Sequence, residues 1–279
     1  MDLSKLTVNT ISDDAITLDA TNTILDARNV MMKYNISRVV IVNKKGLVGI
    51  ITEKDIVNFI YSSNFNRRPN EIKLKEIIKD KKPITVDANT HLRTCAKLML
   101  DNNISSLIVT RKNSKEIGII TKTDIVEHYS KYYKRINKVK DYMTTIVLSI
   151  SKNESVNEAM RILLDNKISR LLVINNDKLI GIITIRDLMP ITSLVGLGYE
   201  QYKKNQFTSN ISTIGIKGFI LVEDIMNNNL ITIFRTDDLA EAAKIMVRKR
   251  ISGLPVVDKN EKLNGIITKT DIVKAFSET

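Results

Sequence analysis

The sequence predicts an α/β protein made of four copies of one β-α-β-β-α unit, paired into two modules with pseudo-two-fold symmetry. Two phrases that each occur four times indicate the repeat. The phrase Gly-Ile-Ile-Thr-x-x-Asp begins at Gly49, Gly118, Gly181 and Gly265. At a near-fixed distance before it stands an Ile-Ser pair, at Ile36, Ile104, Ile168 and Ile251. Self-similarity of this kind is the signature of a supersecondary unit repeated along the chain.

Each copy is expected to begin with a short strand and a helix. The strands are predicted at residues 16–18, 84–86, 148–150 and 231–233. A polar cluster follows each strand and supplies candidate N-cap residues. In the fourth copy, Leu239, Ala242, Ala243 and Met246 then fall at i, i+3, i+4 and i+7, the spacing of an amphipathic helix. The pattern of the first copy is weaker, because Arg28 takes one of the apolar places.

A hairpin and a second helix complete each copy. Uninterrupted apolar runs at 39–42, 107–109, 171–174 and 254–257 predict strands with both faces buried. A short polar turn leads from each run into the Gly-Ile-Ile-Thr strand, so the two strands should be antiparallel. The second helix begins at the Thr-x-x-Asp end of the phrase. One such unit is too small to bury a comfortable core alone, which is why pairing is expected, with a boundary near Ile136.

Composition limits the class of protein. The net charge of +12 points towards anionic partners, whether nucleotides, nucleic acid or an acidic protein. The single cysteine, Cys95, excludes an internal disulfide framework and fits a reducing cytosol. The sequence shows no secretory signal and no apolar run of about 20 residues. We therefore expect a cytoplasmic protein that does not enter the membrane.

These elements resemble the cystathionine β-synthase (CBS) domain. The resemblance is carried by their order, by the Gly-Ile-Ile-Thr-x-x-Asp ending and by short leading helices at 139–143 and 221–226. Four copies are similar to a double Bateman module, as in the γ subunit of AMP-activated protein kinase and in stand-alone archaeal proteins. The resemblance implies module 1 at 1–136 (repeats at about 10–62 and 74–132) and module 2 at 137–279 (repeats at about 139–192 and 221–279). A connector at 189–219 interrupts the second module; we expect it to pack over that module or over a second copy of the chain, a passive tether being the alternative.

The Thr-x-x-Asp phrase has a structural and a functional interpretation. Threonine can cap the second helix while the aspartate reaches back to the free amide, as in a capping box. A helix N-terminus also offers N–H groups to a phosphate, and a carboxylate can accept hydrogen bonds from a ribose diol. In the family that the chain resembles, the aspartate binds ribose and the threonine lies by the phosphate. The resemblance implies ligand contacts at Thr52, Asp55, Thr121, Asp124, Thr184, Asp187, Thr268 and Asp271.

The residue after each Ile-Ser pair distinguishes the repeats. It is Arg38 or Arg170 in the first and third copies, but Ser106 or Gly253 in the second and fourth. A guanidinium offers phosphate a planar, permanently charged fork, and in the kinase γ subunit an arginine at this place contacts AMP phosphate. The alternative is an exposed charge at a strand end. One arginine repeat in each module predicts one phosphate cluster in each module. The expected ligand-binding set is completed by Ser37, Ser169, Thr17, Thr85 and Thr232.

No catalytic site and no metal site are predicted. His91 and Cys95 are one turn apart on a helix, but zinc needs three or four ligands, and core packing of Cys95 is the simpler interpretation. No nucleophile–base pair or glycine-rich nucleotide fingerprint occurs. The expected function is therefore a non-catalytic adenine-nucleotide sensor or regulatory protein. It would have no cofactor, take AMP, ADP or ATP as its regulatory ligand, with S-adenosylmethionine as a further candidate, and act as a homodimer or on a regulated partner protein.

Two alternatives remain open. Tyr129, Tyr132, Tyr133 and Tyr142 interleave with a basic run at 131–140, which could bind single-stranded nucleic acid on a scaffold of repeats. The chain could also be a regulatory subunit whose ligand sites are vestigial and which acts by protein contact.

Overall fold

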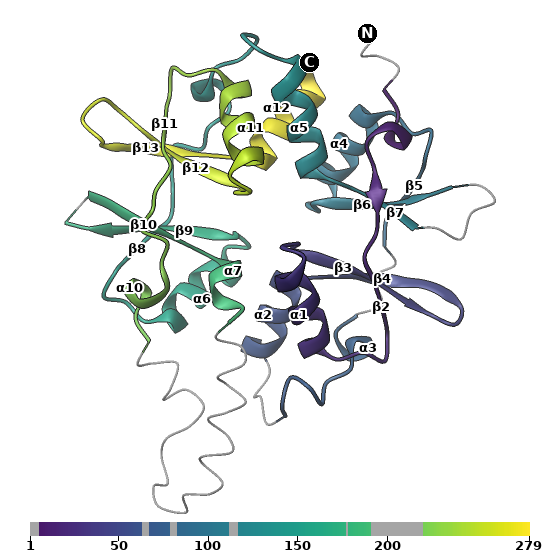
Figure 1. Ribbon diagram of the computed structural model, residues 1–279. Coiled ribbons are helices and arrows are strands. Elements are labelled where there is room, and N and C mark those ends of the chain that lie inside the picture. Colours follow the sequence, from purple (N-terminus) through teal and green to yellow (C-terminus); the bar gives the residue numbers. More distant parts are fainter. Residues whose placement is uncertain (1–5, 63–66, 79–82, 112–116, 177, 191–219) are drawn as a thin grey trace, which may run out of the picture. The chain divides into compact units, whose positions relative to one another are not determined.

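The computed structural model describes residues 6–62, 67–78, 83–111, 117–176, 178–190 and 220–279, and these contain four β-α-β-β-α repeats (Figure 1). Each repeat is built on a small mixed sheet. Its first strand runs parallel to the second, and the second runs antiparallel to the third. The predicted α/β class and the predicted order of elements are confirmed.

The bounds of the elements are as follows. The first repeat has β2 (Thr17–Asp19), α1 (Ile24–Lys33), β3 (Arg38–Asn43), β4 (Gly46–Thr52) and α2 (Glu53–Ser62). The second has β5 (Thr85–Asp87), α4 (Leu92–Asp101), β6 (Ser106–Thr110), β7 (Ile117–Thr121) and α5 (Lys122–Tyr132). The third has β8 (Ser149–Ser151), α6 (Val156–Asp165), β9 (Arg170–Asn175), β10 (Lys178–Thr184) and α7 (Ile185–Leu188). The fourth has β11 (Ile233–Phe234), α11 (Leu239–Arg248), β12 (Gly253–Val257), β13 (Leu263–Thr268) and α12 (Lys269–Glu278).

A short segment precedes each repeat, and we call these four stretches the lead segments. They contain η2 (Val8–Thr10) with β1 (Asp13–Asp14), α3 (Leu74–Ile77), η3 (Val139–Asp141) and α10 (Val222–Ile225).

The chain divides into two compact units that do not follow the order of the repeats. Unit 1 comprises Met1–Ala15, Pro83–Val147 and Ile231–Thr279; unit 2 comprises Ile16–Lys82 and Leu148–Leu230. Unit 1 therefore holds the second and fourth repeats, and unit 2 holds the first and third. The modules predicted at 1–136 and 137–279 would each join one repeat from each unit, and that pairing stays a prediction.

Each unit has its own hydrophobic core. In unit 1, α12 packs against α4 and α5, and α5 also packs against α11. The four apolar residues predicted to share one face of α11 are all fully buried there, among them Leu239 and Met246. In unit 2, α2 contacts α1 and α7, and α6 also contacts α7. Burying a large side chain such as that of Leu239 or Met246 contributes about 1.5–3 kcal/mol, and a lone repeat is too small to bury many of them.

The last helix of the third repeat is short. α7 ends at Leu188, whereas α2, α5 and α12 are ten or eleven residues long. Pro190 follows this end, and proline has no N–H with which to continue the hydrogen bonds of the helix. The carbonyl oxygen of Met189 instead accepts a hydrogen bond from Arg28 Nε at 3.0 Å. Arg28, which interrupted the apolar pattern of the first repeat, thus caps a helix of the third.

Two sequence predictions touch the limits of the described chain. Most of the connector at 189–219 lies outside the described residues, so its predicted packing stays a prediction. Within the described residues, no helix is both long enough and apolar enough to cross a membrane.

Candidate ligand-binding site

The two repeated phrases lie opposite each other on neighbouring strands. The residue after each Ile-Ser pair is the cross-strand partner of the threonine in Thr-x-x-Asp, in the pairs Arg38–Thr52, Ser106–Thr121, Arg170–Thr184 and Gly253–Thr268. The residue after that threonine donates its backbone N–H to the serine carbonyl, for example Glu53 N to Ser37 O at 3.0 Å. The two phrases therefore form one local structure, which explains why they recur together.

A left-handed residue ends the first helix of every repeat. Asn35, Asn103, Lys167 and Arg250 have φ between 52° and 56°. The turn carries the long-range hydrogen bond of a Schellman end, seen between Ile36 N and Met31 O at 2.9 Å. Asparagine tolerates this conformation, whereas for lysine and arginine it costs about 1–2 kcal/mol of conformational free energy. The same helix end thus brings the Ile-Ser pair next to the start of the second helix in all four repeats.

Each Thr-x-x-Asp phrase is a helix cap. The threonine backbone N–H and hydroxyl both donate to Oδ2 of the aspartate, at 2.6 to 2.9 Å in all four repeats. In the first repeat, Asp55 N also donates to Thr52 Oγ1 at 3.2 Å. The structural interpretation is confirmed. Ribose binding by these aspartates stays a prediction, and it would draw on the carboxylate oxygen that the cap does not use.

The predicted site residues divide between the two units. Unit 2 holds Thr17, Ser37, Arg38, Thr52, Asp55, Ser169, Arg170, Thr184 and Asp187. Unit 1 holds Thr85, Thr121, Asp124, Thr232, Thr268 and Asp271. Arg38 and Arg170, predicted to serve separate modules, therefore lie in the same compact unit, and both are half-buried. Unit 1 has a buried serine, Ser106, and a glycine at the corresponding places.

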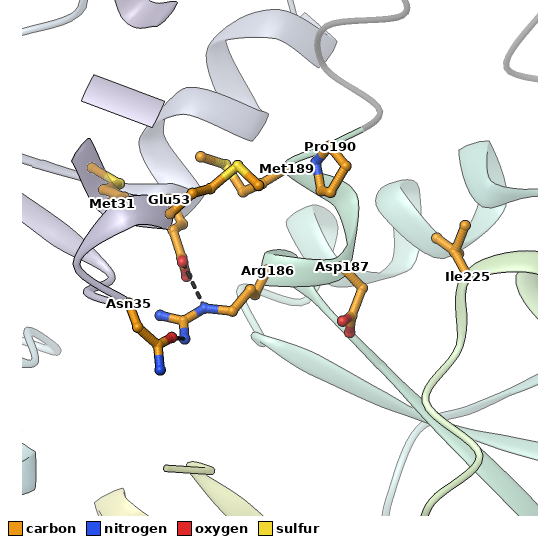
Figure 2. Close-up of a pocket in the computed structure, with 9 residues that line it drawn as sticks. Met31, Asn35, Glu53, Arg186, Asp187, Met189, Pro190 and Ile225 are labelled. Atoms are coloured by element: carbon orange, nitrogen blue, oxygen red, sulfur yellow. Dashed lines mark hydrogen bonds and ion pairs between the residues drawn. The ribbon is translucent and has the colours of Figure 1, made fainter. Parts of the chain in front are cut away.

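The first and third repeats meet at an ion pair that sequence reasoning missed. Arg186 Nε donates to Glu53 Oε1 at 2.8 Å, and Arg186 Nη1 donates to Asn35 Oδ1 (Figure 2). The Glu53 side chain is only 13% exposed, against 42% for Arg186. Burial raises the pKa of Glu53, opposed by the charges of Arg186 and Arg38 and reinforced by Asp187.

The second and fourth repeats meet through the corresponding positions of unit 1. Lys122 Nζ donates to Thr270 Oγ1 at 3.0 Å, and Lys269 Nζ donates to Thr123 Oγ1 at 2.8 Å. In both units the first variable residue of one Thr-x-x-Asp phrase contacts the second variable residue of the other. The sequence carries no signal for the Glu53–Arg186 pair, because these positions vary from one repeat to the next.

A pocket of about 450 Å³ opens beside this ion pair in unit 2. Methionines and other apolar residues form much of its wall, with the ion pair and Asp187 among its polar groups (Figure 2). Its lining is Met31, Met32, Asn35, Glu53, Arg186, Asp187, Met189, Pro190 and Ile225. The volume falls in the range of small-molecule sites. The pocket lies against Met189 and Pro190, where α7 stops after one turn.

The glycine of every repeated phrase lies against the lead segment of another repeat. Asp13 and Asp14 pair with β7 beside Gly118, and Asn227 pairs with Ile182 beside Gly181. A Cβ on Gly181 would stand 2.6 Å from Met226 Sδ, and one on Gly265 would overlap the carbonyl oxygen of Thr144. A Cβ on Gly49 would meet only a methyl group of Ile78, at 3.1 Å. The glycines therefore admit a neighbouring backbone or side chain to the sheet.

Two of the four tyrosines named for the nucleic-acid alternative are buried in unit 1. Tyr129 and Tyr133 are buried and stacked, with ring centroids 5.0 Å apart. The ring of His128, 6% exposed, lies 4.6 Å from that of Tyr132, and burial lowers the pKa of the imidazole, with a smaller contribution from the charge of Lys131. The hypothesis that these tyrosines stack on bases is therefore wrong for Tyr129 and Tyr133. Their spacing of four residues on one helix was the available signal.

The described residues contain no candidate for a reactive cysteine or for a metal site. Cys95 is fully buried, as expected of a core residue, and burial raises the pKa of its thiol to about 11. Among the residues that the structure describes, no three His, Cys, Asp or Glu side chains gather in a group that could hold a metal ion.

Comparison with known proteins defines the class. The family model of the CBS domain matches residues 8–62, 74–131, 139–191 and 222–278. The chain belongs to the CBS domain family, and the resemblance inferred from its repeats is confirmed. Protein MJ1225 of Methanocaldococcus jannaschii is 29% identical over 94% of this chain and 95% of that protein.

The crystal structure of MJ1225, proposed to be an archaeal homologue of the γ subunit of AMP-activated protein kinase, matches with a TM-score of 0.81 and 26% identity. The match covers 97% of this chain and 100% of that one. A 33.4 kDa protein from the ribosomal RNA operon of Thermofilum pendens is 25% identical over 98% of this chain and 91% of its own length. A conserved protein of Pyrococcus horikoshii shares the fold, with a TM-score of 0.63 at 22% identity over 97% of this chain and 99% of that one.

Proposed function

We propose that this protein is a non-catalytic sensor of adenine nucleotides, in which ligand binding changes how the CBS repeats are arranged. The observation that carries the proposal is the recurring junction of the two phrases, with Arg38 and Arg170 directly opposite the capping threonines. The likeness to MJ1225, proposed to be a homologue of the kinase γ subunit, supports it.

The chemistry of the junction suits a phosphate and a ribose. Arg38 Nη2 donates to Ser37 Oγ at 2.8 Å, so the guanidinium is held at the start of β3, across from the N-terminus of α2. A guanidinium binds phosphate through short, charge-assisted hydrogen bonds. The carboxylates of Asp55 and Asp187 can accept hydrogen bonds from the ribose hydroxyls. AMP, ADP and ATP carry both groups, and S-adenosylmethionine carries the ribose alone.

Sensing requires that the ligand bind one arrangement of the repeats better than another. A second copy of the chain or a regulated protein would read the change. We place this activity in the cytoplasm, consistent with a single cysteine that is fully buried.

The test is a thermal-shift panel of AMP, ADP, ATP, adenosine and S-adenosylmethionine, run beside mass spectrometry of small molecules released from protein purified without added ligand. A ligand at a hundred times its Kd should add about 2.7 kcal/mol to the free energy of unfolding. We expect at least one nucleotide to raise the unfolding temperature. The increase should be smaller in Arg38→Ala than in the wild type. No shift with any compound, together with no adenosyl compound released, would contradict the proposal.

A further inference from the structure

Glu53 stands out among the variable positions of the Thr-x-x-Asp phrases. The eight residues at these positions are Glu53, Lys54, Lys122, Thr123, Ile185, Arg186, Lys269 and Thr270. Four of the eight are basic, and Glu53 is the one acid. Its place at the first residue of α2 is the place of a lysine in both repeats of unit 1.

The carboxylate of Glu53 lies among cations that a phosphate would also use. Arg186 holds it at 2.8 Å, and the charge of Arg38 also acts on it. The other charged group that acts on it, Asp187, repels it. Removing a carboxylate from water is costly, and here the two arginines offset part of that cost. The arginines are thus already partly neutralised by a group of the protein itself.

Arg186 faces both Glu53 and the pocket. It is 42% exposed and lines the pocket, while its side chain reaches towards Glu53 and Asn35 (Figure 2). Asp187, the next residue, is directed away from the ion pair (Figure 2). Asp187 and Arg186 both line the pocket, so one ligand can reach a carboxylate and a guanidinium there.

We propose that Glu53 is a built-in competitor for the ligand phosphate in unit 2, and that a phosphate binds there by replacing the Glu53 carboxylate on Arg186. This inference rests on the proposed function and names the residue that sets its selectivity. Glu53 makes the binding of a phosphate weaker than the arginines alone would allow, and leaves the binding of an uncharged adenosine unaffected. Unit 2 therefore discriminates between ligands by their charge.

Proton uptake is a consequence of the replacement. When a phosphate binds to Arg186, the buried carboxylate of Glu53 loses the ion pair with that arginine. The neutral, protonated form of Glu53 is then favoured. Arg186, Arg38 and Asp187 are the charged groups that act on it. Binding of AMP should then take up a proton, and the preference for AMP over adenosine should rise as the pH falls. In unit 1 the contacts across the unit are from lysine to neutral hydroxyls, so no such coupling arises from them.

The experiment compares the full chain with two glutamine variants. Glu53→Gln keeps the shape of the side chain and removes its charge. Glu158→Gln makes the same change in a surface ion pair with Arg161, elsewhere in unit 2. Titration calorimetry with AMP, adenosine and pyrophosphate is run at pH 7.5 and 6, in buffers of different ionisation enthalpy. Circular dichroism and the unfolding midpoint establish that both variants fold.

We expect Glu53→Gln to raise the affinity for AMP about tenfold, the size of one charge-assisted hydrogen bond, and to leave adenosine unchanged. Proton uptake should be larger in the wild type than in Glu53→Gln by up to one proton, and this difference cancels the titration of AMP itself. Glu158→Gln should behave as the wild type.

The outcomes separate this inference from the proposed function. If adenosine and AMP bind but Glu53→Gln changes neither their affinity ratio nor proton uptake, the inference is overturned and the proposed function stands. If no adenosine compound binds but pyrophosphate affinity still rises in Glu53→Gln, the competition is supported and the proposed function fails. If none of the three probes binds to the wild type or to Glu53→Gln, both are overturned.

Discussion

The sulfur atom of Met226 fills the space in which a side chain on Gly181 would begin, at 2.6 Å from the position of a Cβ. The two residues come from α10's C-cap and from β10, and Asn227, the next residue, pairs with Ile182 of the same strand. At Gly181 it is therefore a neighbouring segment that leaves no room for a side chain.

Alanine substitutions should rank the four glycines by what their Cβ would meet. Gly265→Ala should lower the free energy of unfolding by about 3 kcal/mol, because a backbone carbonyl of Thr144 must move and because alanine is strained at the φ of +158° that Gly265 adopts. Gly49→Ala should cost about 1 kcal/mol, because the methyl group of Ile78 can rotate away. Urea unfolding of the two variants provides the measurement. Equal losses, or a larger loss in Gly49→Ala, would show that contact with the lead segments does not determine the cost.

Charge removal at the junction should affect phosphate and ribose differently. Arg38→Ala or Arg170→Ala should weaken AMP about tenfold and leave adenosine unchanged, because a charge-assisted hydrogen bond is lost. Asp55→Asn should weaken both ligands, because the ribose is common to them. Asparagine can still accept the capping hydrogen bonds from Thr52, so the helix start is preserved. Calorimetry that finds equal losses of AMP and adenosine in the arginine variants would refute this assignment.

Acidification should destabilise unit 1 through His128. Burial lowers the pKa of this imidazole from its ordinary value of 6.5, so the folded state favours the neutral ring. Its contribution is present above pH 6.5 and is lost as the pH falls from 6.5 towards the lower pKa of the folded state, because the unfolded chain then binds the proton first. His128→Phe, which keeps a ring beside Tyr132, should flatten the dependence of the unfolding midpoint on pH between 7.5 and 5.5. His91→Gln, at the exposed start of α4, should keep the wild-type slope, and the prediction fails if both variants do.

The left-handed helix ends offer two stabilising substitutions. Lys167→Gly and Arg250→Gly should each raise the free energy of unfolding by about 1 kcal/mol, because glycine adopts positive φ without a steric penalty. Asn103→Gly serves as the control and should change stability much less, since asparagine already tolerates this conformation. Chemical denaturation distinguishes the cases. A destabilised Lys167→Gly or Arg250→Gly would indicate that the basic side chain makes a contact worth more than the strain.

The sequence was sufficient to predict the fold of one repeat, but not to predict which other repeat packs against it. Helical spacing such as that of Leu239 and Met246 identifies the buried face of a helix, and the hairpin follows from the short turn after an apolar run. A buried helix face shows the same apolar spacing whichever repeat packs against it. The spacing therefore could not predict that the second repeat shares a core with the fourth. Pro190, by contrast, was a readable signal for the short α7.

The candidate site was also predictable only in its repeated residues. The phrases named Arg38, Thr52 and Asp55 because repetition made them visible. Glu53 and Arg186 stand at positions that vary between repeats, and repetition therefore gives no reason to select them. Their role depends on an ion pair between residues 133 positions apart, which only the packing of two repeats can reveal.

The lead segments have a consequence for where the chain can be cut. The segment before each repeat belongs to the other unit: residues 8–15 complete the sheet edge of β7, whereas the repeat that they introduce starts at Ile16 in unit 2. Trimming the N-terminus to the start of the first repeat would leave that repeat whole and open an unpaired edge in the second. An open strand edge is a template for association with other chains. Truncations drawn at the borders of the repeats would thus promote aggregation through a repeat that they never touched.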